Sequence, residues 1–168
     1  MLRILNGEVY DPINGVNGEV RDICVQDGKV VADVQGGRTI DARGMVVMPG
    51  GVDMHAHIAG PKVNLARKMR PEDHRGDVMP RTPLTRSGVG GSVPSTFTTG
   101  YRYALMGYTT AFDAAIPPLA ARHAHEELAD TPCIDRGFYV LMGNNHFIMK
   151  CLQQNEPEKL KSFVAWLL

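Results

Sequence analysis

Three apolar segments separated by helical patterns restrict the folds open to this chain more than any other feature. The segments cover residues 45–54, 108–114 and 136–143. A near-continuous apolar run such as 45–54 is typical of a strand buried on both faces. The sequence before the second segment predicts a helix over 95–106. The sequence between the second and third segments predicts another over 117–129. Strands that alternate with helices predict parallel βα units and therefore an α/β fold.

The last part of the chain predicts two more helices, at about 144–153 and from about 156 onward. Three parallel strands form a partial sheet and cannot close an eight-stranded barrel. The final residues, 162–168, are strongly apolar, whereas chain ends usually fray in polar residues. We therefore expect the chain to be a truncated piece of a longer protein.

Residues 1–45 predict a small antiparallel β unit. The pair Asn6-Gly7 is a turn signal after a short apolar strand. Residues 20–26 alternate apolar and polar side chains, which is the period of a half-buried strand, and Asp27-Gly28 predicts a turn into the next strand. A further short strand is expected at 38–42.

A long insertion at about 59–96 follows the first apolar strand. It is rich in Gly, Pro, Arg and Ser, lacks sustained hydrophobic periodicity and is locally basic. A loop of this length in a compact domain is usually either functional or disordered. We weigh the functional interpretation and the solvated, mobile one equally.

The segment that ends the first strand carries a candidate metal site. His55 and His57 are two residues apart, and residues i and i+2 of a strand point to the same face. Both imidazoles can therefore bind one divalent ion, for which zinc is the natural candidate. Asp53 shares that face and could ligate the metal or orient an imidazole as a supporting carboxylate. Two satisfied core histidines are the less favoured interpretation.

Composition excludes several classes of partner. The formal net charge is zero, with 18 basic and 18 acidic residues, so no overall field favours nucleic acid or an anionic membrane. No stretch approaches the roughly 20 apolar residues of a membrane span. The three cysteines are scattered without Cys-x-x-Cys spacing, which is typical of reduced thiols in a cytoplasmic protein.

Three motifs carry a family resemblance. They lie at Asp22–Val31, Thr39–Gly44 and Val47–His57, and together they resemble the opening of the amidohydrolase superfamily. The resemblance implies a composite β-sandwich portion (1–45) followed by the first three βα units of a (β/α)8 TIM barrel (46–168). It also implies a mononuclear or binuclear metal centre, with zinc at His55 and His57.

Further motifs narrow this resemblance. They lie at His57–Arg67, Arg70–Arg75, Thr98–Ala104, Gly107–Thr110 and Leu141–Asn145. With these segments the sequence resembles the catalytic A subunit of formylmethanofuran dehydrogenase and the alpha subunit of the bacterial formyltransferase/hydrolase complex.

That resemblance implies an enzyme of C1 metabolism which works within a larger complex of several subunits. It would interconvert N-formylmethanofuran, or formylmethylofuran, with formate and the free amine. Iron–sulfur clusters are not expected in this chain, because the cysteine runs that hold them are absent. The general base and the remaining metal ligands would lie beyond Leu168, so the 168 residues alone are expected to be inactive.

Several polar residues are weaker candidates for substrate contacts. Arg and Lys side chains of the insertion could clamp the carboxylate-rich tail of a methanofuran-type carrier. His146 follows the third strand and could contact substrate or metal, although a polar helix-start residue is the plainer interpretation. The candidates are Asn64, Arg67, His74, Arg75, Asn145 and His146.

Two other functions stay open from the sequence. One is a different cyclic-amide hydrolase, of the dihydroorotase or hydantoinase kind. The other is a non-catalytic scaffold that lacks the second half of an active site.

Overall fold

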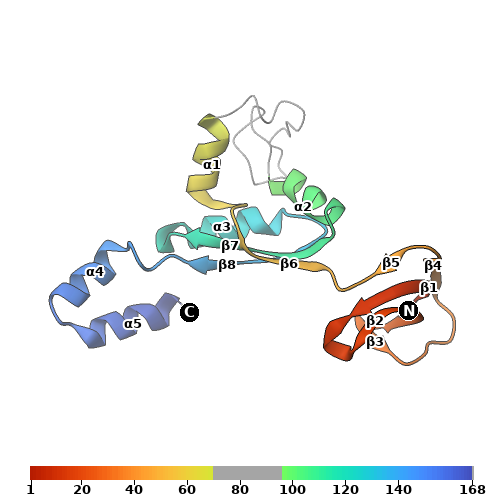
Figure 1. Ribbon diagram of the computed structural model, residues 1–168. Coiled ribbons are helices and arrows are strands. Elements are labelled where there is room, and N and C mark those ends of the chain that lie inside the picture. The colour runs from red at the N-terminus through yellow and green to blue at the C-terminus, as the bar shows by residue number, and fades with distance from the viewer. Residues whose placement is uncertain (70–95, 168) are drawn as a thin grey trace. The chain divides into compact units, whose positions relative to one another are not determined.

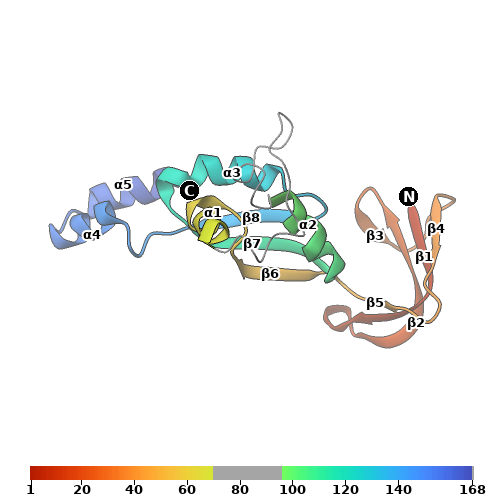
Figure 2. The same cartoon turned by 90° about the horizontal axis from the view of Figure 1, so that it is seen from above.

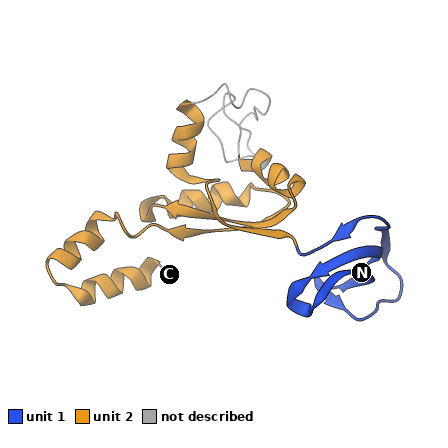
Figure 3. Cartoon of the chain, in the orientation of Figure 1, with its two compact units in different colours: residues 1–49 blue, residues 50–168 orange. Residues whose placement is uncertain are grey.

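The computed structural model describes residues 1–69 and 96–167 (Figure 1). The chain divides into two compact units, Met1–Pro49 and Gly50–Leu168 (Figure 3). The sequence predicted the boundary after residue 45. The observed boundary lies after Pro49, because Val46 and Val47 pair with the first strand of the first unit.

The first unit is a five-stranded sheet with the order β3-β2-β1-β4, in which β5 also pairs with β1. Its elements are β1 (Leu2–Asp11), η1 (Pro12–Asn14), β2 (Val16–Gln26), β3 (Lys29–Val31), β4 (Arg38–Asp41) and β5 (Val46–Val47). β1, β2 and β3 are antiparallel, as predicted. β4 and β5 run parallel to β1, so the prediction of an antiparallel unit is wrong for these two strands.

The two turn signals of this unit have different outcomes. Asp27 and Gly28 both adopt positive φ, 51° and 75°, and join β2 to β3 as predicted. Asn6-Gly7 is instead an irregularity within β1, where the register shifts between Ile4 and Gly7. Asn6 tolerates a φ of 61° there, and its side-chain amide donates to Asp41 at 3.0 Å. The chain therefore continues in one direction instead of reversing.

The second unit has a three-stranded parallel sheet with the order β6-β7-β8. The strands are β6 (Gly51–Ala56), β7 (Tyr108–Ile116) and β8 (Asp135–Val140). The helices are α1 (Gly60–Met69), α2 (Thr96–Leu105), η4 (Pro118–Ala120), α3 (Ala121–Ala129), α4 (His146–Gln153) and α5 (Pro157–Leu167). The α/β class and the parallel order are confirmed. No helix in the described ranges is long and apolar enough to cross a membrane.

Helices α1, α2 and α3 all lie on one face of this sheet, as Figures 1 and 2 show from two directions. A small apolar core fills the space between, with Ala56, Ala111 and Leu128 among its members. On β6, Val52 and Met54 are 53% and 54% exposed. Within the described residues only one face of β6 is therefore covered, which differs from the predicted burial on both faces. The apolar run is divided between two strands, because β5 belongs to the first unit and β6 to the second.

The expected irregular insertion contains a helix. α1 covers Gly60–Met69, and residues 70–95 lie outside the described part of the chain. α1 lacks an apolar stripe because its buried side is polar. Arg67 is 8% exposed, and Asn64, one turn earlier, is half-buried. A search for hydrophobic periodicity could not detect a helix of this kind.

Candidate metal centre

The two histidines lie side by side at the carboxyl end of β6. His55 is the second-to-last residue of the strand, which ends at Ala56, and His57 follows it. Their ring centroids are 5.4 Å apart with an angle of 86° between the planes, and both side chains are exposed. Glycines before them allow close packing, since a Cβ at Gly50 would lie 2.0 Å from Thr109 Cγ2. The imidazoles are thus available to a common ligand at the edge of the sheet.

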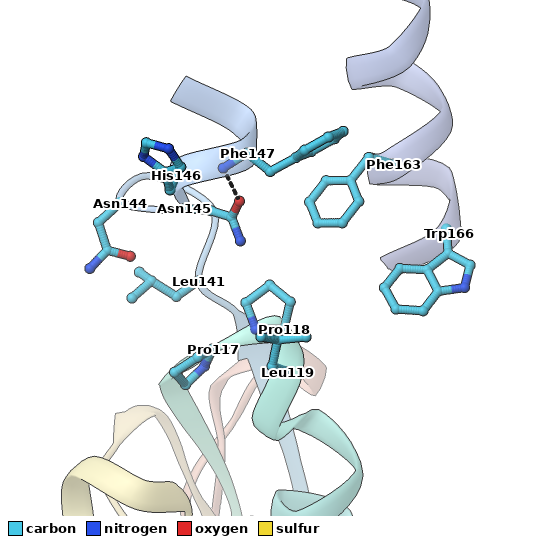
Figure 4. A pocket seen from close by; sticks show the side chains of 10 residues that line it. All are labelled: Pro117, Pro118, Leu119, Leu141, Asn144, Asn145, His146, Phe147, Phe163 and Trp166. Carbon is cyan, nitrogen blue, oxygen red and sulfur yellow. Dashed lines mark hydrogen bonds between the residues drawn. The ribbon is translucent and has the colours of Figure 1, made fainter. Parts of the chain in front are cut away.

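The carboxyl ends of β7 and β8 reach the same edge, because the three strands are parallel. A hollow lies where these ends lead into η4 and α4 (Figure 4). It is lined by Pro117, Pro118, Leu119, Leu141, Asn144, Asn145, His146, Phe147, Phe163 and Trp166. In parallel α/β proteins ligands bind outside the carboxyl ends of the strands. This edge is therefore the candidate functional edge of the second unit.

Two predicted substrate residues line this hollow. Asn145 is the N-cap of α4, and its Oδ1 accepts hydrogen bonds from the backbone N–H groups of Phe147 at 3.0 Å and Ile148 at 3.2 Å. His146 begins α4 and is exposed. The carbonyl oxygen of the Asn145 side chain thus serves the helix. A substrate contact by either residue stays a prediction.

Asp53 supports the strand that carries the histidines. Its Oδ1 accepts the backbone N–H of His55 at 3.0 Å, and its Oδ2 accepts the hydroxyl of Tyr103 at 2.9 Å. Burial, with the hydrogen bond and the charge of Asp53, raises the pKa of Tyr103 to about 12. The carboxylate reaches His55 through its backbone amide, not through its ring. Its predicted role as a metal ligand or imidazole partner remains a prediction.

The residues after His57 are held by a buried carboxylate from the neighbouring strand. Asp113 of β7 is 1% exposed. Its Oδ2 accepts the N–H groups of Ile58 at 2.7 Å and Ala59 at 3.0 Å, and its Oδ1 accepts that of Ala115 at 3.2 Å. A buried carboxylate is stable only when such donors replace its water. Asp113 therefore fixes the backbone where the chain leaves β6.

A second buried carboxylate continues this support. Glu127 of α3 is 1% exposed and accepts the backbone N–H of Gly60 and the side-chain amide of Asn64. His123, one turn earlier on α3, lies 3.2 Å from the same carboxylate. Asn64, a predicted substrate residue, thus connects α1 to α3 through its hydrogen bond to Glu127.

Arg67 supplies the positive charge of this cluster. Its Nη2 donates to the carbonyl oxygen of Ile58 at 2.8 Å and its Nη1 to Oδ1 of Asn64 at 3.1 Å. Burial lowers the pKa of the guanidinium, while the charges of Glu127 and Asp113 oppose that shift. The contacts of Arg67 are internal to the protein, and its predicted contact with substrate stays a prediction. His74 and Arg75 lie outside the described residues.

Sequence reasoning missed Tyr103, Asp113 and Glu127. Two of them left a signal, because Asp113 interrupts an apolar strand and Glu127 stands beside Leu128 on the buried face of a helix. A charged residue in an apolar pattern is buried only if it is paired. That signal could have identified the residues, though not their partners.

The ring nitrogens of His55 and His57 are suitable zinc ligands, since imidazole nitrogen is one of the ligands that zinc prefers. Two such ligands are, however, fewer than a zinc site needs. Within residues 1–69 and 96–167 no group of three or more His, Cys, Asp or Glu residues is arranged to hold a metal. A zinc site takes three or four protein ligands. His55 and His57 can therefore supply part of a metal site, completed by ligands from elsewhere.

A sequence model described as the amidohydrolase family matches residues 38–168. This chain belongs to the amidohydrolase family. The match includes β6 and its two histidines, and it extends through all three parallel strands.

Two similar relatives of this amidohydrolase match nearly its whole length. Protein FwdA of Methanocaldococcus jannaschii is 53% identical over 166 residues, which cover 98% of this chain and 29% of the relative. The A subunit of the formyltransferase/hydrolase complex Fhc of Methylorubrum extorquens is 40% identical over 162 residues, which cover 95% of this chain and 28% of the relative. The chain therefore spans less than a third of the length of either relative.

A solved structure agrees with these relatives. The crystal structure of the formyltransferase/hydrolase complex FhcABCD from Methylorubrum extorquens, in complex with methylofuran, matches with a TM-score of 0.81 and 37% identity. The match covers 99% of this chain and 30% of that one. A dihydroorotase of Streptococcus pneumoniae is 47% identical, but only over 66 residues, or 36% of this chain.

Proposed function

We propose that His55 and His57 are two ligands of a zinc centre, binuclear in the whole protein, in a metal-dependent amidohydrolase. The proposal is supported by the adjacent, exposed imidazoles at the carboxyl end of β6 and by the family match over the same residues. Zinc bound there would polarise a carbonyl oxygen and lower the pKa of a bound water. This chain would contribute the two imidazoles and, through Asp53 and Tyr103, a fixed backbone at His55. The general base and the other ligands would come from outside the described residues.

The proposed architecture is the opening of a two-domain fold. The first unit would be part of a composite β-sandwich, and β6, β7 and β8 would be the first strands of a (β/α)8 barrel. Two observations favour this. Helices α1, α2 and α3 cover one face of the sheet, and Val52 and Met54 on β6 are exposed, as expected of side chains that line a barrel interior.

The proposed substrate is a formylated amine of the methanofuran type, with formate and the free amine as products. This proposal rests on how much of this chain the relatives match. FwdA and the Fhc relative match 98% and 95% of this chain, and the similar FhcABCD structure was solved with methylofuran. We further propose that the protein works with partner subunits of such a complex.

A cytoplasmic location belongs to the same proposal. It is supported by the free thiols Cys24, Cys133 and Cys151, which are typical of a reducing compartment. We also propose that the 168 residues alone are inactive, because two imidazoles are too few to hold zinc tightly.

The test uses the full-length protein that carries this segment, purified with its partner subunits. We expect formate release from the N-formylated furan carrier and zinc in the purified protein. His55→Ala and His57→Ala should each lower the zinc content and abolish formate release. His125→Gln is the matched control, since that exposed histidine lies on α3 and its ring packs on Phe138. Full formate release by the two alanine variants would reject the proposal.

A cyclic-amide hydrolase is the second candidate, and the dihydroorotase similarity over 66 residues favours it. The two functions separate in one experiment. Hydrolysis of dihydroorotate or a hydantoin, without formate release from the furan carrier, would establish the second. Zinc-free protein with no activity on either substrate would instead indicate a scaffold.

A further inference from the structure

The three residues that follow His57 are held by charged side chains from three different elements. Asp113 of β7 binds the N–H groups of Ile58 and Ala59, Glu127 of α3 binds that of Gly60, and Arg67 of α1 binds the carbonyl of Ile58. All three charged side chains are at most 8% exposed. Burying charge is costly, so this segment is held at a considerable energetic expense.

We propose that Asp113 is a positioning residue for His57. The inference rests on the proposed metal centre and deepens it, because it names a residue that acts on a ligand without touching the metal. Oδ2 of Asp113 accepts the N–H of Ile58, the residue bonded to His57, at 2.7 Å. The Cα of His57 is one peptide unit away from that contact. Fixing the backbone at Ile58 therefore fixes the Cα of His57, to which the imidazole side chain is attached.

The chemistry of the contact explains why this position holds a carboxylate. Asp113 faces three backbone N–H donors, those of Ile58, Ala59 and Ala115. A carboxylate only accepts, so both oxygens suit these donors. An asparagine has nearly the same shape but no charge, and its one acceptor oxygen can serve Ile58 and Ala59 only if its NH2 group turns toward the N–H of Ala115. Asp113→Asn therefore replaces the charge-assisted hydrogen bonds to the segment with weaker neutral ones, without creating a cavity.

Glu127 and Arg67 act on the same segment from the helix side. Glu127 holds Gly60, which adopts a φ of 87° at the start of α1. Arg67 holds the Ile58 carbonyl at 2.8 Å. These contacts lie further along the chain from His57 than the contact with Ile58 N–H. Their effect on the imidazole should be smaller than that of Asp113.

A purely structural role predicts a different result. If Asp113 only satisfied backbone groups, its substitution would destabilise the protein but leave the metal bound normally by the folded molecules. If it positions His57, metal affinity falls, and it falls only while His57 is present. A double-mutant cycle separates the two outcomes, because coupling appears only between residues that act together.

The experiment measures Co2+ affinity of the full-length protein by competition with a chromophoric chelator, with thermal unfolding of the metal-free protein recorded in parallel. Four proteins form the cycle: the parent, Asp113→Asn, His57→Ala and the double variant. We expect Asp113→Asn to weaken Co2+ binding about tenfold or more in the parent, the size typical of residues that orient metal ligands. In the His57→Ala background the same substitution should have little effect.

Arg136→Met is the matched control. Arg136 also donates to backbone carbonyls, those of Leu128 at 2.5 Å and Ile134 at 3.3 Å, where the chain enters β8. Arg136 thus lies at the amino end of the parallel strands, whereas the histidines lie at their carboxyl end. The variant should lower the unfolding temperature while leaving Co2+ affinity unchanged.

The outcomes are distinguishable from failure of the metal site itself. If His57→Ala leaves Co2+ affinity unchanged, the proposed metal centre is wrong. If His57→Ala weakens binding but Asp113→Asn has no effect, or an equal effect in both backgrounds, the positioning role is overturned. Should Asp113→Asn not fold, Asp113→Glu provides the same cycle, because it keeps the charge but displaces the carboxylate from the N–H groups of Ile58 and Ala59. It should weaken binding with His57 present and not without it, and equal effects in both backgrounds would again overturn the role of Asp113.

Discussion

Tyr103 donates its hydroxyl hydrogen to Oδ2 of Asp53 over 2.9 Å, across a separation of 50 residues. The other oxygen of that carboxylate accepts the backbone N–H of His55 at 3.0 Å. One carboxylate therefore joins α2 to the strand that carries the candidate ligands. On the far side of His57, Asp113 makes the equivalent connection to β7. The two histidines are thus supported from both directions along the chain.

The first prediction concerns the ionisation of Tyr103. Its pKa is raised to about 12 from the ordinary value of 10.0, chiefly by burial and then by Asp53. A raised pKa favours the protonated, folded form. The contribution of the Tyr103 hydroxyl to the free energy of unfolding is therefore fully present below pH 10 and is lost as the pH rises toward 12.

Ultraviolet titration of tyrosinate formation checks this directly. The parent should show a phase near pH 12 that is absent in Tyr103→Phe. Asp53→Asn should move that phase to lower pH, because the negative charge beside the hydroxyl is gone. An unchanged titration in Tyr103→Phe would show that the hydroxyl does not ionise as described.

The second prediction compares two arginines. Arg67→Met should lower the free energy of unfolding by about 2–4 kcal/mol, since its hydrogen bonds to Ile58 and Asn64 are lost and the buried carboxylates of Asp113 and Glu127 lose a nearby positive charge. Arg122 is the control, with its side chain 94% exposed and its Nε 3.5 Å from Glu126. Arg122→Met should cost less than about 1 kcal/mol. Denaturant unfolding measures both.

The same Arg67 variant tests the substrate contact predicted for that residue. If Arg67→Met leaves stability unchanged and raises KM for the formylated carrier, Arg67 binds substrate instead of stabilising the fold. A loss of stability with unchanged KM in the folded fraction would assign the residue to the internal cluster.

The third prediction concerns the packing of α2. A Cβ at Gly100 would lie 2.2 Å from the backbone oxygen of Pro132. Backbone cannot move aside cheaply, so Gly100→Ala should destabilise the protein by about 1–3 kcal/mol. A Cβ at Gly143 would meet no atom within 4 Å. Gly143→Ala should change stability by less than about 0.5 kcal/mol, and equal thermal shifts for the two variants would contradict the prediction.

The fourth prediction separates two roles of Asn145. Asn145→Ala should lower stability by about 1 kcal/mol, because the N-cap bonds to Phe147 and Ile148 are lost. Asn145→Asp should keep that stability, since aspartate caps helices equally well. If Asn145→Asp raises KM for the carrier, its amide also contacts substrate. An unchanged KM leaves capping as its role.

Much of the local structure could be predicted because it depends on neighbours in the sequence. Periodicity predicted β7, α3 and β8 within a few residues of their observed ends. The pair Asp27-Gly28 formed its turn because both residues tolerate positive φ. The histidine pair was likewise recognisable, because two-residue spacing at a strand end places two side chains near each other.

The errors arose where a partner distant in sequence decides the outcome. Asn6-Gly7 carries a turn signal, yet pairing of β1 with β2 on both sides of it keeps the strand continuous. α1 was not predicted because the face it buries is polar. Asn64 and Arg67 are accommodated there by Glu127 of α3 and by the carbonyl of Ile58, which lie outside the helix.

The sequence by itself therefore determined the α/β class, the order of the elements and the position of His55 and His57. Only the tertiary structure decided what holds those histidines. Ile58 and Asp113 are 55 residues apart, and Gly60 and Glu127 are 67 apart. No local pattern relates residues at such separations, because their contact exists only after the parallel strands and their helices have packed together.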